Sequence, residues 1–272
     1  MSRAASVRAE PSTGAGLKPP LKWAGGKRWL VPRLKEIWRR HEKHRLIEPF
    51  CGGLAVALGL SPVRALLNDV NPHPVNFYRH LQTGLKIRIP MRNESALFYR
   101  HRSEFNRLVT GRGLETRKAA ELFYYLNRTG YNGLCRFNRK GEFNVPFGHH
   151  KRINYLRDFR HYEAPLASWR FETRDFEQLP VEKGDFIYAD PPYDVPFTQY
   201  AKNGFGWEEQ ERLAQWLSRH RGPVVLSNQA TDRVLKLYRR LKFKLHLVDA
   251  PRMISCTGDR SPAKEVIATR GL

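Results

Sequence analysis

The hydrophobic pattern of the chain begins with two strand–turn–helix units. The segment 46–53 runs from apolar residues into a pair of glycines, and the small and apolar residues at 54–60 have helical character, which predicts a strand, a tight turn and a helix. A second strand is predicted over 64–67 and a second helix over 72–82. Two consecutive units of this kind favour a parallel sheet.

The pattern changes over the middle of the chain. Residues 95–108 and 115–127 predict helices with no strand between them. Residues 130–148 predict a hairpin, because a glycine-containing turn at 139–142 joins two short segments that carry aromatic side chains. We expect this region to be an inserted recognition module with an exposed basic hairpin.

The alternation of strands and helices then resumes. We predict strands at 170–173, 185–189 and 224–227, helices at 208–219 and 231–240, and a final antiparallel pair of strands at 242–248 and 265–269. A chain of 272 residues is near the upper size for a single core. The expected fold class is therefore α/β, with one catalytic domain interrupted by a largely helical insertion.

The charge balance points to polyanions. The chain carries 48 Lys and Arg against 26 Asp and Glu, a formal net charge of +22. A field of this sign attracts nucleic acid and speeds its encounter with the protein. A protein from a proteome rich in arginine would show the same balance, so charge alone does not identify the partner.

The cysteines and the N-terminal stretch restrict the class further. Cys51, Cys135 and Cys256 form no Cys-x-x-Cys pair, so the sequence predicts neither a disulfide framework nor a metal site and favours a reducing cytoplasm. No apolar run approaches the roughly 18 residues of a membrane helix. Residues 1–16 lack periodicity, which predicts a flexible tail, with a transit peptide as the second interpretation. We expect a monomer from a prokaryote or phage.

The carboxyl ends of the first two predicted strands carry candidate binding residues. Glu48, Phe50 and Gly52 lie at the end of the first strand and in the turn after it, and Asp69 follows the second strand. Glycines here let a ligand approach the backbone at the carboxyl edge of an open α/β sheet, and an acidic residue ending the next strand can accept hydrogen bonds from a ribose. These residues predict a cofactor pocket, although such turns are also common without a ligand.

The segment Asp190-Pro191-Pro192-Tyr193 follows another apolar strand and is expected at the same edge of the sheet. Two successive prolines fix the backbone and remove two N–H donors, which leaves neighbouring carbonyls free to accept hydrogen bonds. Asp190 and a backbone carbonyl can accept from the amino group of a planar base while Tyr193 stacks on its ring. The alternative interpretation is a proline-stiffened turn with a capping aspartate.

Together, these segments resemble the DNA adenine methyltransferase (Dam) family from Leu21 to Ile267. The matching segments are Lys22-Trp23-Ala24-Gly25-Gly26-Lys27, Glu48-Pro49-Phe50-Cys51-Gly52-Gly53, Asn68-Asp69-Val70-Asn71, Asp190-Pro191-Pro192-Tyr193, Ser227-Asn228 and Ile254-Ser255. The resemblance implies a Rossmann-like S-adenosylmethionine-dependent methyltransferase sheet at 17–73 and 157–272. It also implies an inserted, mostly helical target-recognition domain with a β-hairpin at 74–156.

The resemblance assigns residues to the cofactor and to catalysis. Residues expected to contact S-adenosylmethionine are Trp23, Lys27, Glu48, Phe50, Gly52, Asp69, Phe176 and Asp190. The expected catalytic segment is Asp190, Pro191, Pro192 and Tyr193, and no metal is expected. Taken singly, Trp23 would be a core aromatic and Lys27 a surface charge, and only their spacing with the other segments favours the cofactor roles.

The predicted hairpin resembles the element with which Dam enzymes read DNA. The residues expected to contact double-stranded DNA are Lys22, Arg128, Tyr131, Asn132, Leu134, Arg136, Asn138, Pro146 and His150. Arg136 can donate two hydrogen bonds to a guanine edge, and Leu134 or Pro146 can press on a thymine methyl group. A basic, aromatic hairpin could alternatively bind phosphates without sequence preference.

The target implied by this resemblance is GATC. Members that recognise GATC carry the same Leu-x-Arg and Pro arrangement, and the resemblance implies that Lys22 contacts the first guanine. Tyr131 and Asn132 resemble the residues that invade the duplex and hold the gap. His150 departs from the family, since GATC-recognising relatives have a tyrosine there, and this leaves the outer base contact open.

The expected reaction is methylation of the exocyclic amino group of adenine in double-stranded DNA. That group points into the duplex, so the base must leave the stack. Asp190 and the backbone carbonyl near Pro191 would accept its hydrogens during direct in-line attack, without a covalent enzyme intermediate. Two alternatives stay open: an amino methyltransferase acting on cytosine, RNA or a protein glutamine, and a DNA-binding protein without activity. The sequence does not decide whether a restriction–modification system is involved.

Overall fold

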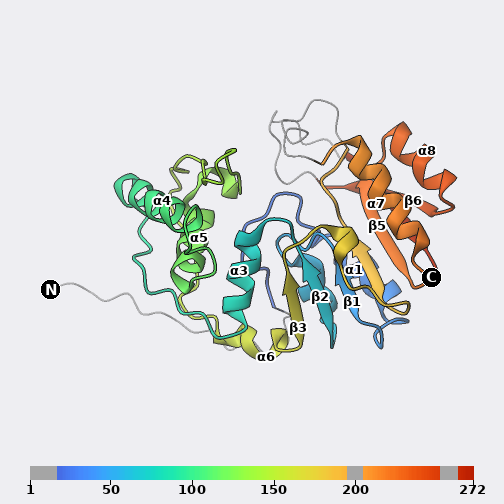
Figure 1. Cartoon of the computed structure of the whole chain (residues 1–272), viewed down its shortest axis with the longest axis horizontal. Helices are drawn as coiled ribbons and strands as arrows, with labels where there is room; N and C mark the ends of the chain where they lie inside the picture. The colour runs from blue at the N-terminus through green and yellow to red at the C-terminus, as the bar shows by residue number, and fades with distance from the viewer. Residues whose placement is uncertain (1–16, 195–204, 252–262) are drawn as a thin grey trace.

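The computed structural model describes residues 17–194, 205–251 and 263–272. The tail predicted at 1–16 and the Ile254-Ser255 segment lie outside these residues. The described chain contains a seven-stranded sheet with the order β3-β2-β1-β4-β5-β7-β6 (Figure 1). The strands are β1 (Leu46–Glu48), β2 (Ala65–Asn68), β3 (Trp169–Glu172), β4 (Phe186–Ala189), β5 (Val224–Gln229), β6 (Lys244–Ala250) and β7 (Ala263–Arg270).

The first five strands run parallel, and β7 is antiparallel to both of its neighbours, β5 and β6. Parallel neighbours need a long crossover connection, which the helices between them supply. The parallel sheet and the antiparallel pair at its edge, both predicted from the alternation of elements, are confirmed. The central register pairs Ile47 of β1 with Leu66 of β2 and Ile187 of β4.

Alternate strand residues face two separate layers of helices. The helices are α1 (Val31–Trp38), α2 (Ala55–Leu60), α3 (Pro72–Leu81), α4 (Ser95–Val109), α5 (Arg117–Thr129), α6 (Glu163–Leu166), α7 (Trp207–Arg219) and α8 (Asp232–Arg240). Leu46 and Leu67 join the buried cluster of α1 to α5, whereas Ile47 and Leu66 join that of α7 and α8. This twofold periodicity is that of strands buried on both faces.

The predicted insertion lies to one side of the sheet. Figure 1 shows α4 and α5, in green, beyond α3. α5 packs on α3 and on α4, and its Tyr124 stacks on Phe77 of α3 with ring centroids 5.4 Å apart. The aromatic side chains of the insertion therefore continue the core on that face of the sheet.

The segment 130–148 forms the predicted turn. It does not form the two predicted strands, so the prediction of strands is wrong. Within the described chain the segment forms isolated bridges, which are Gly130 with Phe147 and Phe137 with Phe143. At the turn, Asn138 N donates to Glu142 O at 2.9 Å. A continuous ladder fails because Pro146 has no N–H to donate and Asn132, with φ 51°, turns the chain.

Some elements have no clear sequence signal. The pattern does not predict α1, α6 or the single 3-10 turns η1 (Tyr131–Gly133), η2 (Arg160–Tyr162) and η3 (Phe176–Gln178). The residue before α1, Leu30, makes no side-chain cap. By contrast, α5 begins at Arg117 because Thr116 accepts a hydrogen bond from Ala119 N at 3.2 Å.

Candidate active site

Three acidic residues meet at one edge of the sheet. β2 and β4 both pair with β1 in parallel, so the carboxyl ends of all three strands lie side by side. Glu48 ends β1, Asp69 follows β2, and Asp190 follows β4. The glycine turn and the Asp-Pro-Pro-Tyr segment therefore lie at the same edge, as the sequence predicts.

Lys27 is the cation of this edge. Its Nζ lies 3.1 Å from Asp190 Oδ1, and its side chain is 5% exposed against 20% for Asp190. The same ammonium lies 4.5 Å from the centroid of the Tyr193 ring, and Ser227 Oγ donates to Asp190 Oδ1 at 2.7 Å. Breaking such a largely buried pair is costly, so Lys27 and Asp190 are held as a unit.

The glycine turn is closed by Trp23 and Asp69. Gly52 has φ +44°, and a Cβ added there would lie 2.6 Å from Trp23 Nε1. Gly52 N donates to Asp69 Oδ2 at 3.0 Å, and Asn71 N donates to Oδ1 at 2.9 Å. Burial raises the pKa of the Asp69 carboxyl to about 6, although both of these hydrogen bonds act to lower it. Only glycine allows this approach of the indole to the backbone.

Glu48 and two aromatic rings line the rest of the edge. Glu48 is 2% exposed, and its Oε1 has no hydrogen-bond partner among the described residues. Burial, and secondly the Asp190 carboxylate, raise its pKa well above the usual range. Phe50 and the buried Phe176 pack together with ring centroids 5.9 Å apart. The edge thus offers an apolar wall beside an unpaired polar atom.

The Asp190–Asp194 loop is held from behind by β5, β7 and α7. Gln210 Nε2 donates to Pro192 O at 2.7 Å, and Asn228 Nδ2 donates to Gln210 Oε1 at 2.9 Å. Tyr193 OH donates to Glu265 Oε2 at 2.6 Å. Sequence reasoning missed Gln210 and Glu265, because neither stands in a local motif and both reach the loop through tertiary contacts.

The hairpin presents some of its predicted residues to solvent. Tyr131 is 50% exposed, and Asn132 and Pro146 are exposed as well. Leu134 is partly buried against the core. Arg136 is exposed but donates from Nε to Asn144 Oδ1 at 2.8 Å.

Other predicted DNA contacts are engaged within the protein. Asn138 Oδ1 accepts from two backbone N–H groups of the turn. The Arg128 guanidinium donates to Pro20 O, and His150 Nε2 lies 3.0 Å from Gly130 O. Lys22 Nζ donates to Arg128 O at 3.1 Å, and burial, followed by the charge of Arg128, lowers its pKa.

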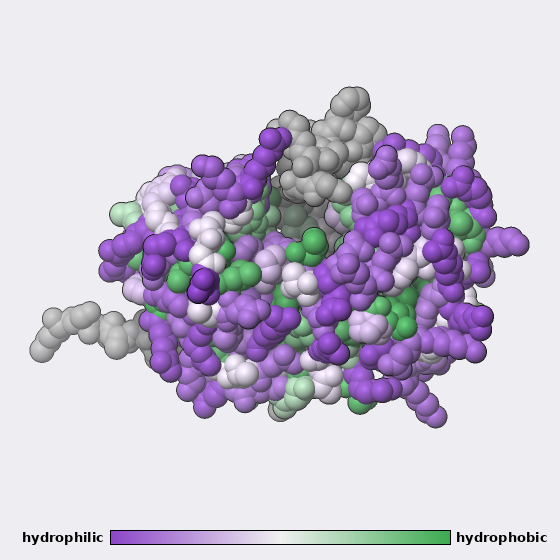
Figure 2. Space-filling model, in the orientation of Figure 1, coloured by the Kyte–Doolittle hydropathy of each residue, from purple (hydrophilic) through white to green (hydrophobic). Residues whose placement is uncertain are grey.

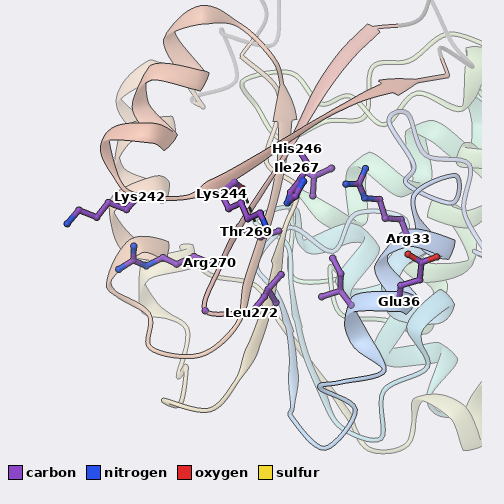
Figure 3. A pocket seen from close by; sticks show the side chains of 11 residues that line it. Arg33, Glu36, Lys242, Lys244, His246, Ile267, Thr269, Arg270 and Leu272 are labelled. Carbon is purple, nitrogen blue, oxygen red and sulfur yellow. Dashed lines mark hydrogen bonds between the residues drawn. The ribbon is translucent and has the colours of Figure 1, made fainter.

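A cavity of about 430 Å³ lies away from this edge, between α1 and the β6–β7 pair (Figure 3). Its lining includes Arg33, Lys244 and His246. Lys244 lies on the edge strand β6, where a charged side chain hinders pairing with another chain. None of the acidic or glycine residues described above lines this cavity, so the chemistry assigns the candidate site to the carboxyl edge instead.

Comparison with known proteins identifies the family of the chain. Residues 23–254 match the family described as D12 class N6 adenine-specific DNA methyltransferase. The chain belongs to this family. The Retron Ec67 DNA adenine methylase of Escherichia coli is 32% identical over 92% of this chain and 90% of its own length. The DNA adenine methylases of Salmonella typhi and Escherichia coli K12 are each 35% identical, over 91% of this chain and 93% of theirs.

Membership in the D12 class confirms the central expectations from the sequence. The methyltransferase is an enzyme that modifies adenine in DNA and takes the methyl group from a donor. Its seven-stranded α/β sheet is the Rossmann-like sheet of S-adenosylmethionine-dependent methyltransferases. Both alternatives raised by the sequence, another substrate and an inactive binding protein, are thereby disfavoured.

Two further findings concern the described ranges, 17–194, 205–251 and 263–272. No helix in them has the length and apolar character needed to cross a bilayer. Their His, Cys, Asp and Glu side chains form no group of three or more that could hold a metal ion.

Proposed function

We propose that this D12-class enzyme methylates the exocyclic amino group of adenine within GATC in double-stranded DNA, using S-adenosylmethionine. The observation that carries the proposal is the buried Lys27–Asp190 pair, 3.1 Å long, at the same edge as the Trp23-covered turn at Gly52. Both the segment proposed to bind the base and the turn proposed to bind the cofactor lie at this edge, which supports the proposal.

The edge fits the proposed donor. The unpaired Glu48 Oε1 can accept a hydrogen bond from an N–H or O–H group of S-adenosylmethionine. Asp69 has further lone pairs that can accept hydrogen bonds from the ribose hydroxyl groups. Trp23, Lys27, Gly52 and Asp190 complete the proposed contacts, with Phe50 and Phe176 as the apolar wall. When bound, S-adenosylmethionine supplies an electrophilic methyl group on sulfur, which the amine attacks directly.

The target base must be turned out of the duplex before it reaches Asp190. The exposed Tyr131 and Asn132 are the residues proposed to fill the gap. Gln210 already occupies the Pro192 carbonyl, so Asp190 and the Pro191 carbonyl are the proposed acceptors for the amino hydrogens. Accepting both hydrogens favours a more pyramidal and more nucleophilic nitrogen.

The GATC proposal rests on the hairpin. Arg136 would exchange its hydrogen bond to Asn144 for a guanine edge, while Leu134 or Pro146 would touch a thymine methyl group. Lys22 would contact the first guanine, and Arg128, Asn138 and His150 would support the hairpin. Residues 74–156 are the proposed recognition domain, and 17–73 with 157–272 the proposed catalytic domain of a monomer.

One experiment tests the proposal. The protein is incubated with labelled S-adenosylmethionine and with duplexes that differ only at a GATC site, and the modified base is located by nuclease sensitivity. Label on the adenine of GATC alone is expected, whereas equal labelling of both duplexes would remove the assigned specificity. The Asp190→Asn variant is the control: binding of the duplex should survive while transfer falls by roughly a hundredfold or more.

A further inference from the structure

Residues 21–27, the linking segment, contact both the recognition insertion and the reaction edge. In Figure 1 this part of the blue trace passes between the green helices and the strands. It is short, since Lys27 lies six positions after Leu21 in the chain. The contacts at its two ends decide whether target recognition and the reaction edge move together.

Asn127, at the end of α5, holds the first end of the segment. Lys22 N donates to Asn127 Oδ1 at 2.9 Å, and Asn127 Nδ2 donates to Lys22 O at 2.8 Å. The asparagine is 1% exposed. Two opposed hydrogen bonds from one buried amide fix both the position and the direction of the backbone at Lys22.

The same end of the segment touches the start of the hairpin. A Cβ added to Gly133 would lie 2.6 Å from Lys22 Cβ. Gly130 N donates to Leu126 O at 2.8 Å, so the hairpin also continues directly from α5. Asn127 therefore sits where α5, the hairpin and the linking segment meet.

The other end of the segment belongs to the reaction edge. Trp23, which follows Lys22 directly, lies against the glycine turn, where a Cβ at Gly53 would come within 2.7 Å of Trp23 Cβ. Lys27 forms the pair with Asp190. The backbone at Lys22 is therefore directly continuous with the indole and the ammonium that lie at this edge.

We propose that Asn127 is a positioning residue that couples target recognition to the reaction edge through the linking segment. The inference rests on the proposed function, since it takes duplex DNA and S-adenosylmethionine as the two ligands. Correct seating of the hairpin holds Lys22 against Asn127 and thereby sets Trp23 on the glycine turn and Lys27 beside Asp190. The coupling acts on the rate of transfer from the bound complex, and much less on the binding of either ligand alone.

Asn106 of α4 provides a matched control. Phe143 N donates to Asn106 Oδ1 at 2.8 Å, and Asn106 Nδ2 donates to Phe143 O at 3.2 Å. This is the same amide clamp, but it joins two parts of the insertion and does not reach the linking segment. Loss of its hydrogen bonds should loosen the hairpin without uncoupling the reaction edge.

The test compares Asn127→Ala with Asn106→Ala in full-length protein. Single-turnover methyl transfer is measured at saturating GATC duplex and S-adenosylmethionine, with the Kd of each ligand measured separately. Asn127→Ala is expected to slow transfer about tenfold while both Kd values stay within about twofold. Asn106→Ala is expected to weaken duplex binding and to leave the saturated rate unchanged.

A wild-type rate for Asn127→Ala, or equal slowing by both variants, would overturn the coupling, because a purely structural role predicts matched losses. Circular dichroism gives the folded fraction. If Asn127→Ala is poorly folded, Asn127→Asp carries the test, since it keeps an acceptor for Lys22 N–H and loses the donor to Lys22 O. Failure of the wild-type protein to methylate the duplex at all would count against the proposed function and not against the coupling alone.

Discussion

At the glycine turn, the Asp69 carboxylate is subject to two opposing influences. Burial favours its neutral form, while the N–H groups of Gly52 and Asn71 favour its charged form, and burial dominates to place the pKa at about 6. A carboxylate is the better acceptor for ribose hydroxyl groups. Donor binding should therefore depend on the protonation state of this one residue.

Affinity for S-adenosylmethionine should fall as the pH drops below about 6. Protonated Asp69 is a poorer acceptor for the hydrogen bonds of the ribose hydroxyl groups. If S-adenosylmethionine binds the charged form of Asp69 better, its binding lowers the pKa of Asp69. Thermodynamic linkage then requires that S-adenosylmethionine binds more weakly below this pKa. At pH 5 the Kd should be roughly tenfold above its neutral value. Calorimetric titration from pH 5 to 8 measures this. A dependence that persists unchanged in Asp69→Asn would assign the titration to another group.

At the scale of elements, the site depends on close approach between segments far apart in the chain. Trp23 can lie on the turn after β1 only because Gly52 and Gly53 lack side chains. The Asp190–Asp194 loop after β4 keeps its shape because buried amides of α7 and β5 hold it. Both contacts fix the position of the segments that follow β1 and β4.

Gly52→Ala should destabilise the fold and abolish donor binding, since the new Cβ would strike Trp23 at 2.6 Å. Gly141→Ala is the control: it has φ +77° but nothing within 4 Å of an added Cβ. Each variant pays the left-handed backbone penalty of about 1 to 2 kcal/mol. Gly52→Ala should lose roughly 1 to 3 kcal/mol more. Urea unfolding compares the two, and equal losses would contradict the clash.

Gln210→Leu should lower the free energy of unfolding by about 1 to 3 kcal/mol, because it removes the donor to the Pro192 carbonyl and the acceptor for one N–H of Asn228. It should also lower kcat with little change in the KM for DNA. Gln215→Leu, at an exposed position of the same helix, should change neither. A silent Gln210→Leu would show that the loop holds its shape without α7.

At the scale of the whole molecule, charge governs the encounter with DNA. The face seen in Figure 2 is mainly hydrophilic, and the net charge of +22 makes the duplex its natural counterpart. Phosphate contacts of this kind release counterions and do not depend on sequence. Under the proposed function, specificity comes from the hairpin side chains that are proposed to contact base edges.

Arg136→Ala and Lys140→Ala should separate these two contributions. The arginine variant should lose about 1 to 3 kcal/mol of discrimination at one base pair. The lysine variant, from the exposed turn, should bind all duplexes more weakly and reduce the salt slope by about 1. Fluorescence titrations at several salt concentrations measure both. If Arg136→Ala weakened every duplex equally, the arginine would be a phosphate contact.

The sequence by itself determined the alternation of strands and helices and the shared edge of the sheet at which the glycine turn and the Asp-Pro-Pro-Tyr segment lie. Periodicity and turn chemistry act between neighbours, so strands such as β1 and β4 and the helix α3 can be predicted from adjacent residues. The hairpin shows the limit, since its turn is a local feature whereas its strand pairing depends on Pro146 and Asn132.

Only the tertiary structure decided which side chains meet. The pairs Lys27–Asp190, Tyr193–Glu265 and Asn127–Lys22 join residues 72 or more positions apart, and no local pattern specifies such contacts. Burial likewise raises the pKa of Glu48 and of Asp69, because it removes the water that would stabilise the charged carboxylates. The extent of this burial depends on the tertiary structure. Long-range packing thus brings segments that are far apart in the sequence to one edge of the sheet.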